Sequence, residues 1–221
     1  MAINLDTYEY IIKKLATANA TLVAVSKTKP IKDIEALYQI GHRDFGENYV
    51  QELIDKQLIL PKDIQWHFIG HLQSNKVKYI APFVHLIHGV DSYKLLQEID
   101  KQATKIGRTI DCLLQVHIAQ EETKFGFNEA ELQQLFASNL QALTHIRIKG
   151  MMGMASFTED AEKIRGEFKT LKRLFDIYSQ LEFRNCTLSI LSMGMSSDYK
   201  IAIEEGSNMV RIGSLLFGSR K

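Results

Sequence analysis

Residues 21–30 read TLVAVSKTKP, and this segment separates two α/β folds that the chain could adopt. Its apolar, β-branched beginning predicts a strand that is buried on both faces, as in a parallel sheet. Pro30 suits the first turn of a helix, which we expect over residues 31–41, with Gly41 at its end. An open doubly wound sheet would carry a glycine-rich phosphate loop after its first strand, and SKTKP is not such a loop.

The same alternation of strand and helix continues along the rest of the chain. Parallel strands need such helical crossovers, and one further helix is expected over residues 5–19, ahead of the first strand. The expected strands span residues 21–27, 44–48, 65–70, 86–90, 112–118, 146–154, 187–193 and 208–212. The helices that follow them are expected over residues 31–41, 49–59, 73–80, 92–106, 128–140, 159–180, 198–205 and from 214 onward. Eight such units predict an α/β fold, a single (β/α)8 TIM barrel that forms one domain over residues 1–221, with an extra N-terminal helix.

Composition argues against several classes of protein. The chain has 27 Lys and Arg against 26 Asp and Glu, so we expect no nucleic-acid binding, which usually needs a concentrated basic field. No segment approaches the roughly 20 apolar residues of a membrane helix, and the N-terminus does not resemble a signal peptide. Cys112 and Cys186 are far apart and are expected to be buried and reduced, which favours a cytoplasmic location. A monomer is the simplest expectation, since the sequence identifies no extended apolar surface.

Two lysines lie at the end of the first expected strand and just beyond it, where a barrel places its functional groups. Lys27 closes the apolar run and shares its face with Val23 and Val25. Partial desolvation at the barrel rim disfavours the charged ammonium and exposes the amine lone pair that a Schiff base requires. Lys29 has the same parity but lies beyond the strand, next to Pro30, so we favour Lys27. The alternative is an ordinary rim lysine whose charge reaches water.

A phosphate site is expected after the last two strands, where barrels often bind phosphate. Gly213 lets the backbone approach an anion, and the amides from Ser214 onward begin a helix whose positive end favours negative charge. Ser196 and Ser197 follow the seventh strand and can add hydroxyl and amide groups. The alternative interpretation is two ordinary serine caps of helices.

A Schiff-base lysine and a phosphate cradle at one barrel mouth suggest a phosphorylated aldehyde as ligand. Pyridoxal 5′-phosphate (PLP) is the leading candidate, and the aldose phosphates of aldolases are the competing one. Arg211 ends the eighth strand, next to the first, and can donate to the pyridine nitrogen of PLP. A permanent cation there would keep that nitrogen unprotonated and the ring a weak electron sink. A phosphate clamp or a salt bridge is the alternative role.

Five segments together resemble the pyridoxal phosphate homeostasis proteins (the YggS/PROSC family), and the resemblance covers nearly the whole chain. They are residues 22–30 (LVAVSKTKP), 45–52 (FGENYVQE), 66–76 (WHFIGHLQSNK), 191–196 (LSMGMS) and 210–213 (VRIG) with 217–218 (FG). The fold of that family is similar to the N-terminal barrel of bacterial alanine racemase. The family's fold therefore agrees with the barrel expected from the residues.

The resemblance also implies a cofactor and a role. It implies that Lys27 holds PLP as a Schiff base, and that the protein carries or buffers PLP without an established catalytic residue. PLP-requiring apo-enzymes are the implied recipients. The remaining implied site residues are Asn48 at the rim, Ser196, Gly213 and Ser214 at the phosphate, and Arg211 at the pyridine nitrogen. We also expect His71 near the ring, although a structural role for this histidine stays open.

Two enzymatic alternatives remain, a small PLP-dependent amino-acid racemase and a Schiff-base aldolase. A racemase needs a second acid or base, which alanine racemases take from a C-terminal β-domain that we do not expect beyond Lys221. Three departures from the family pattern are His117 for Asn, Met151 for Leu and Asn208 for Thr. No metal site is expected, because strand spacing would put the rings of His85 and His88 on opposite faces.

Overall fold

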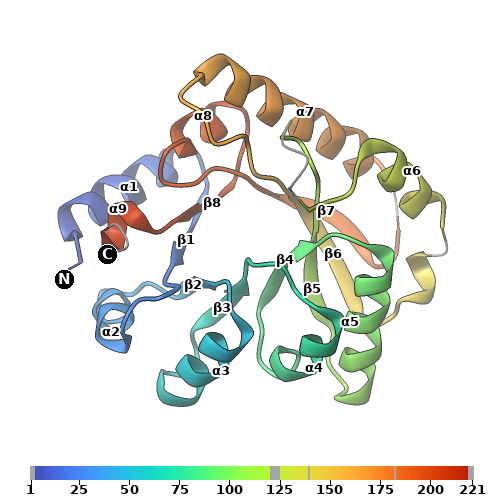
Figure 1. The fold of residues 1–221 in the computed structure, drawn as a ribbon, viewed down its shortest axis with the longest axis horizontal. Helices are drawn as coiled ribbons and strands as arrows, with labels where there is room; N and C mark the ends of the chain where they lie inside the picture. The colour runs from blue at the N-terminus through green and yellow to red at the C-terminus, as the bar shows by residue number, and fades with distance from the viewer. Residues whose placement is uncertain (1–2, 120–124, 139, 182, 219–221) are drawn as a thin grey trace.

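Eight parallel strands close into a barrel in which β8 pairs back onto β1 (Figure 1). The strands are β1 (Thr21–Val25), β2 (Asp44–Glu47), β3 (Gln65–Phe68), β4 (Leu86–Val90), β5 (Ile110–Gln115), β6 (Ile146–Met152), β7 (Cys186–Ser192) and β8 (Met209–Ile212). This computed structural model describes residues 3–119, 125–138, 140–181 and 183–218. The (β/α)8 barrel that the alternating pattern predicts is confirmed.

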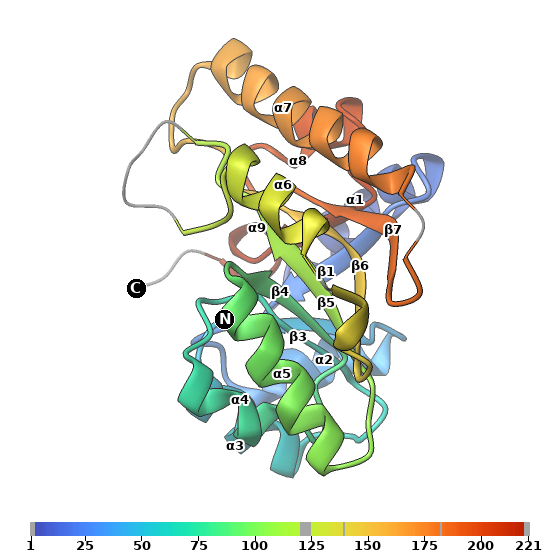
Figure 2. The same cartoon turned by 90° about the vertical axis from the view of Figure 1, so that its right-hand side faces the viewer.

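Helices cover the outside of the barrel. They are α1 (Leu5–Thr17), α2 (Ile31–Gln39), α3 (Val50–Ile59), α4 (Val77–Ile80), α5 (Tyr93–Lys105), α6 (Glu129–Ala137), α7 (Ala161–Ser179), α8 (Tyr199–Glu204) and α9 (Ser214–Phe217), with short 3-10 turns η1 (Ser74–Lys76) and η2 (Leu140–Ala142). Figure 2 shows α5, α6 and α7 lying across the outer side of the strands. The extra N-terminal helix is confirmed as α1, which lies beside α9, and the Asn4 N–H just before it donates to the Leu216 carbonyl at 3.0 Å.

β1 ends two residues before the predicted strand because the chain turns at the barrel mouth. The Lys29 N–H donates to the Ser26 carbonyl at 3.0 Å and closes a turn around Lys27. Within this turn Thr28 has a φ of 62°, a left-handed conformation that few residues other than glycine adopt. Lys27 therefore lies in a tight turn above the strand rather than within it.

β5 and β6 also end before the predicted positions. β5 ends at Gln115, after which Val116 forms an isolated bridge with Phe127 on the way to α6. β6 ends at Met152, and the Gly153 N–H donates to the carbonyl of Ser192 in β7 at 3.1 Å. The apolar pattern that predicted longer strands continues into these loops, because their side chains still pack against the barrel.

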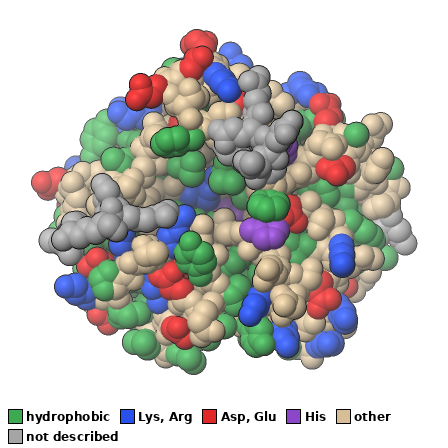
Figure 3. Space-filling view, in the orientation of Figure 1, with side chains coloured by type: hydrophobic (Ala, Val, Ile, Leu, Met, Phe, Trp, Pro, Cys, Tyr) green, Lys and Arg blue, Asp and Glu red, His purple; other side chains and the backbone are tan. Residues whose placement is uncertain are grey.

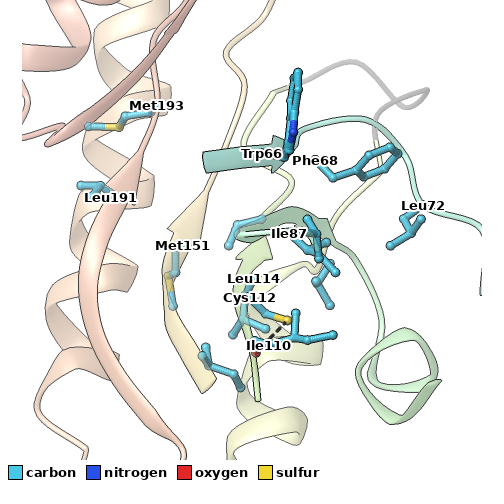
Figure 4. Packing of buried hydrophobic residues seen from close by; sticks show 14 of the residues in the cluster. Trp66, Phe68, Leu72, Ile87, Ile110, Cys112, Leu114, Met151, Leu191 and Met193 are labelled. Atoms are coloured by element: carbon cyan, nitrogen blue, oxygen red, sulfur yellow. Dashed lines mark hydrogen bonds between the residues drawn. The ribbon is translucent and has the colours of Figure 1, made fainter. Parts of the chain in front are cut away.

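Two apolar layers stabilise the barrel. The outer layer lies between strands and helices, and Figure 4 shows Ile87, Leu114 and Met151 of three adjacent strands within it. Met151 is fully buried there, so the departure from the family's Leu keeps an apolar side chain in the core. The inner cluster occupies the barrel interior and consists of Val23, Leu86, Leu113, Met152 and Met209.

The barrel interior also holds buried histidines, and here one prediction is wrong. The ring centroid of His67 in β3 lies 5.4 Å from that of His85 and 5.2 Å from that of His88, so strand spacing does not separate the last two rings. The reason is that His85 precedes the first residue of β4, where regular alternation does not yet apply. Among the described residues, no group of three His, Cys, Asp or Glu side chains is arranged to hold a metal ion.

Both cysteines are buried and neither forms a disulfide, as predicted. Burial raises the pKa of the Cys112 thiol, with the nearby Asp111 carboxylate adding to the effect. Burial also raises the pKa of Cys186 to about 12. Over the described residues, every helix is too short or too polar to cross a membrane.

Candidate functional site

A cavity of about 670 Å³ opens at the carboxyl ends of the strands, which face the viewer in Figure 1. In the space-filling view, a hollow near the centre of this face has Lys or Arg and hydrophobic side chains around it (Figure 3). The cavity brings together seven of the eight predicted site residues, namely Lys27, Asn48, Ser196, Ser197, Arg211, Gly213 and Ser214. The eighth, His71, does not line it.

The two lysines after β1 have different surroundings, although both line the cavity. Lys29 Nζ donates to the carbonyls of Phe217 and Gly218 at 3.0 and 2.9 Å, and so ties the β1 loop to the end of α9. The Lys29 ammonium is thus engaged by two backbone carbonyls. Lys27 is half-buried and lies at the top of the turn closed by Ser26. The preference for Lys27 over Lys29 as the nucleophilic amine stays a prediction.

A buried ionic network lies directly behind Lys27, and sequence reasoning missed it. Glu47 Oε1 accepts from the Ser26 hydroxyl at 2.6 Å and from Lys56 Nζ at 2.7 Å. Lys56 Nζ also donates to the Ser26 carbonyl at 2.8 Å and to Glu52 Oε1 at 2.6 Å. That oxygen of Glu52 accepts the Thr28 N–H at 2.6 Å. The network thus forms hydrogen bonds with the backbone on both sides of Lys27, at Ser26 and at Thr28.

The charged side chains of this network are Glu47, Glu52 and Lys56. Glu47 is fully buried, and burial raises its pKa although the Lys56 ammonium opposes this. The only signal in the sequence was the spacing of Glu52 and Lys56, four residues apart on one helix, which is more typical of a solvated helix face. Nothing in the local pattern indicates that Glu47, at the end of a short strand, is their buried partner.

The two loops predicted to bind phosphate meet at Gly213. The Gly213 N–H donates to Ser196 Oγ at 3.3 Å, which joins the loop after β7 to the loop after β8. A Cβ at Gly213 would lie 3.1 Å from the Val25 carbonyl oxygen, so the absent side chain lets the loop after β8 approach β1. Ser197 and Ser214 are exposed at the cavity edge. Backbone amides and hydroxyl groups therefore converge on one side of the cavity.

Arg211 forms the polar floor of the cavity. Its NH1 donates to the Ser192 carbonyl at 2.9 Å and to Ser192 Oγ at 2.7 Å, and its NH2 donates to the Gly153 carbonyl at 3.0 Å. Burial lowers the pKa of Arg211 to about 10, so the guanidinium remains charged at neutral pH. In the sheet it pairs with Val23 of β1, on the strand that leads to Lys27.

Asn48 contributes an unsatisfied polar atom to the cavity wall. Its Oδ1 is buried and has no hydrogen-bond partner among the described residues. A buried acceptor without a donor is costly. The apolar remainder of the wall includes Ile69, Met154 and Met195, which no sequence motif marks as cavity residues.

His71 lies in an adjoining cavity of about 480 Å³, which shares Asn48 with the first. Its Nδ1 is 3.1 Å from Asp91 Oδ2, and its ring stacks on Phe125 with the centroids 4.3 Å apart. The histidine is thus held by groups from loops after β4 and β5. His117, which departs from the family pattern, donates its backbone N–H to the Phe127 carbonyl at 2.9 Å, and it does not line the first cavity.

Comparison with known proteins places this fold and sequence among characterised relatives. The model of the alanine racemase N-terminal domain matches residues 3–221. A pyridoxal phosphate homeostasis protein of Aquifex aeolicus is 43% identical over 203 residues, which cover 91% of this chain and 88% of the relative. Another, from a Synechocystis species, is 38% identical and covers 97% of this chain and 98% of its own.

Solved structures agree with these matches. PipY of Synechococcus elongatus without PLP superposes with a TM-score of 0.89 at 35% identity, over 96% of this chain and 99% of that one. PipY with PLP bound superposes with a TM-score of 0.82 at 36% identity, over 90% of this chain and 93% of that one. Alanine racemase of Clostridium difficile, at 16% identity, shares the fold with a TM-score of 0.73, over 99% of this chain and 57% of that one. The family resemblance drawn from the sequence motifs is confirmed, and the chain belongs to the pyridoxal phosphate homeostasis proteins.

Proposed function

We propose that this chain binds PLP as a Schiff base on Lys27 and serves as an intracellular carrier and buffer of the cofactor. The observation that carries the proposal is that one cavity is lined by Lys27, the buried guanidinium of Arg211 and two loops rich in amides and hydroxyls. The similar PipY structure with PLP bound supports the same ligand. A volume of about 670 Å³ is that of a small-molecule site.

The residues present fit PLP in charge and in hydrogen-bonding capacity. Asn48 Oδ1 is an unmet acceptor that a ligand hydroxyl can satisfy. Ser196 and Ser214 offer donors beside Gly213, on the side where a phosphate would bind. When bound, PLP supplies an aldehyde that captures amines and a ring that withdraws electrons. Arg211 would hold the ring nitrogen unprotonated by presenting only donors to it, which weakens the ring as an electron sink.

The weak electron sink explains why a carrier is favoured over an enzyme. Proton abstraction from a bound amino acid needs a strong sink and a positioned second base. The described residues of the cavity wall are polar and apolar side chains that can bind a ligand. Arg211 would weaken the PLP ring as an electron sink. Two further parts belong to the proposal: PLP-requiring apo-enzymes receive the cofactor, and the protein acts as a cytoplasmic monomer. The buried, unpaired thiols of Cys112 and Cys186 support a reducing compartment.

The test is borohydride reduction of the PLP-loaded protein followed by peptide mass mapping. Hydride reduces the Schiff-base C=N bond to a stable amine, so we expect the pyridoxyl adduct on Lys27. Lys27→Ala should abolish the adduct and the yellow colour. Lys29→Arg is the matched control, because it lines the same cavity and keeps a cation for the Phe217 and Gly218 carbonyls.

The control should carry the adduct on Lys27 at the yield of the unaltered protein. An adduct on another lysine, or on none, would contradict the proposal. A second measurement separates carrier from racemase. We expect no substantial change in the chirality of L-amino acids during prolonged incubation with the loaded protein, and a Lys27-dependent turnover would overturn the carrier function.

A further inference from the structure

A continuous chain of hydrogen bonds crosses the barrel interior below Arg211. Arg211 NH1 is 2.7 Å from Ser192 Oγ, and Ser192 Oγ is 3.2 Å from His88 Nδ1. His88 Nε2 is 2.9 Å from His67 Nδ1, and His67 Nε2 is 3.0 Å from Asp44 Oδ1. These five side chains come from β8, β7, β4, β3 and β2, so the chain spans the barrel from one wall to another.

The two ends of the chain lie in different surroundings. Arg211 lines the cavity at the carboxyl ends of the strands. Asp44 is the first residue of β2, at the opposite end of the barrel, and its side chain is 25% exposed to solvent. The three groups between them are buried, with His88 and Ser192 fully so. A solvent-contacting carboxylate is therefore linked to the floor of the cavity through groups that water does not reach.

With both imidazoles neutral, the chemistry of the two ends fixes the direction of every link. A guanidinium only donates and a carboxylate only accepts. Because Asp44 accepts, His67 must donate from Nε2, and its Nδ1 is left to accept. His88 must then donate from Nε2, so that its Nδ1 accepts the Ser192 hydroxyl proton, and Ser192 Oγ accepts from Arg211. One tautomer of each neutral imidazole satisfies all four links.

We propose that Ser192, His88, His67 and Asp44 form a directed relay that positions Arg211 and couples the cavity floor to the protonation state of the opposite end of the barrel. A proton added to His67 Nδ1 would leave no acceptor between the two rings unless that link reversed, and a proton added to His88 Nδ1 would reverse the link to Ser192 directly. After reversal, His88 Nδ1 would donate to Ser192 Oγ, in competition with Arg211. Acidification thus loosens the guanidinium that faces the ligand.

The electrostatic surroundings keep His88 neutral and the Asp44 carboxylate ionised near neutral pH. Burial, with His67 and the Arg211 charge adding to it, lowers the pKa of His88 well below its usual value. Burial opposes ionisation of Asp44, but the hydrogen bond from His67 and the nearby imidazoles lower the pKa of this carboxyl overall. His42 and His85 also act on Asp44, His85 acts on His88, and Asp198 acts on Arg211. Around them, Arg43 acts on His42, and Arg108 and Asp111 act on His85.

The first test uses the protein without cofactor and so does not depend on the proposed function. Nitrogen NMR of 15N-histidine-labelled protein reports which ring nitrogen carries the proton. At neutral pH we expect both His67 and His88 as the Nε2–H tautomer. A charged His88, or an Nδ1–H tautomer at either ring, would overturn the relay. Ser192→Ala should remove the donor to His88 Nδ1 and shift that nitrogen's resonance.

The second test uses the PLP-loaded protein and rests on the proposed function. We expect Ser192→Ala to weaken PLP affinity about tenfold, the effect of losing one hydrogen bond to a charged group. Ser192→Thr, which keeps the hydroxyl, should recover most of the affinity. Ser207→Ala is the matched control, since Ser207 is equally buried but donates to carbonyls outside the relay.

Asp44→Asn probes the relay from its far end. The variant should move the midpoint of the pH-dependent absorbance change of bound PLP by about half a pH unit or more, although Asp44 does not line the cavity. An unchanged midpoint together with wild-type affinity in Ser192→Ala would overturn the relay while leaving PLP binding intact. Absence of PLP binding in the unaltered protein would instead overturn the proposed function, and the tautomers would still decide the relay.

Discussion

Lys56 Nζ lies 2.8 Å from the carbonyl oxygen of Ser26, so a buried ammonium on α3 holds the backbone immediately before Lys27. The same ammonium contacts the fully buried Glu47 carboxylate and the partly exposed Glu52 carboxylate. Ion pairs of this kind add little net stability compared with apolar side chains, but removing one partner strands a buried charge. Disrupting this arrangement should therefore destabilise the protein at Ser26, where the turn that carries Lys27 begins.

Lys56→Met should lower the free energy of unfolding by about 3–5 kcal/mol, because Glu47 is left buried without its cation. Urea denaturation monitored by circular dichroism measures the loss. Lys172→Met is the control, since its partner Asp176 is more than half exposed and that pair is worth about 1 kcal/mol or less. The double variant Lys56→Met with Glu47→Gln should recover much of the stability. Equal losses in the single and double variants would contradict the stranded-charge explanation.

Three histidines should set the acid side of the pH–stability profile. Burial lowers the pKa of His42, His85 and His88, and His88 is lowered most. In the unfolded chain these groups titrate near the usual value of 6.5, so below that pH the unfolded state binds more protons than the folded state. Their contribution to stability is complete above about 6.5 and falls as the pH decreases towards the folded values, at up to ~1.4 kcal/mol per pH unit for His88.

Urea unfolding at several pH values between 7.5 and 5.5 measures this slope. Asp44, whose pKa is lowered, acts in the same direction but only in more acidic solution, near its unfolded value of 3.8. Glu47 acts in the opposite direction, because its raised pKa favours the folded state as the pH falls. His88→Asn should reduce the slope of the unfolding free energy against pH by an amount that corresponds to about one proton. Stability that is flat or increases from pH 7.5 to 5.5 would show that the buried imidazoles do not govern this range.

Neither cysteine should react with a thiol reagent in the native state. Burial raises the pKa of Cys112 and that of Cys186, the latter to about 12, and the thiolate is the reactive form. Iodoacetamide at pH 8 should therefore leave both thiols of the folded protein intact for hours, and it should label both when the protein is unfolded in urea. Mass spectrometry measures the labelling. Rapid labelling of the folded protein at either position would show that the outer core opens more readily than its packing suggests.

The fold could be predicted because most barrel strands are apolar runs and a helical stretch follows each strand. The polar cavity residues could be predicted because a barrel collects the groups at its strand ends, as with Lys27, Ser196 and Gly213. Strand ends were misjudged where loop residues such as Val116 are as apolar as the strand they follow. Local sequence does not distinguish an apolar residue in a strand from one that packs just beyond it.

The supporting contacts could not be predicted, because they depend on residues distant in the chain. Lys56 meets Ser26 thirty positions away, and Ser192 meets His88 over 104 positions. His71 was expected beside the cofactor on the basis of its place after β3, but its ring contacts Asp91 and Phe125 from later loops. Spacing along one element carries no information about such partners, which only barrel closure brings into contact.

Gly213→Ala should weaken PLP binding about tenfold. Its new Cβ would lie 3.1 Å from the Val25 carbonyl oxygen, a contact with rigid backbone that forces the loop after β8 away from β1. The φ of Gly213 is −122°, so the effect is steric and not one of backbone strain. We expect a stability loss of about 1 kcal/mol and measure affinity by absorbance titration. Gly166→Ala is the control: its Cβ meets open space inside α7, so the helix should gain ~1 kcal/mol at unchanged affinity. Wild-type affinity in Gly213→Ala would mean that the bound ligand does not depend on the close approach of these two strands.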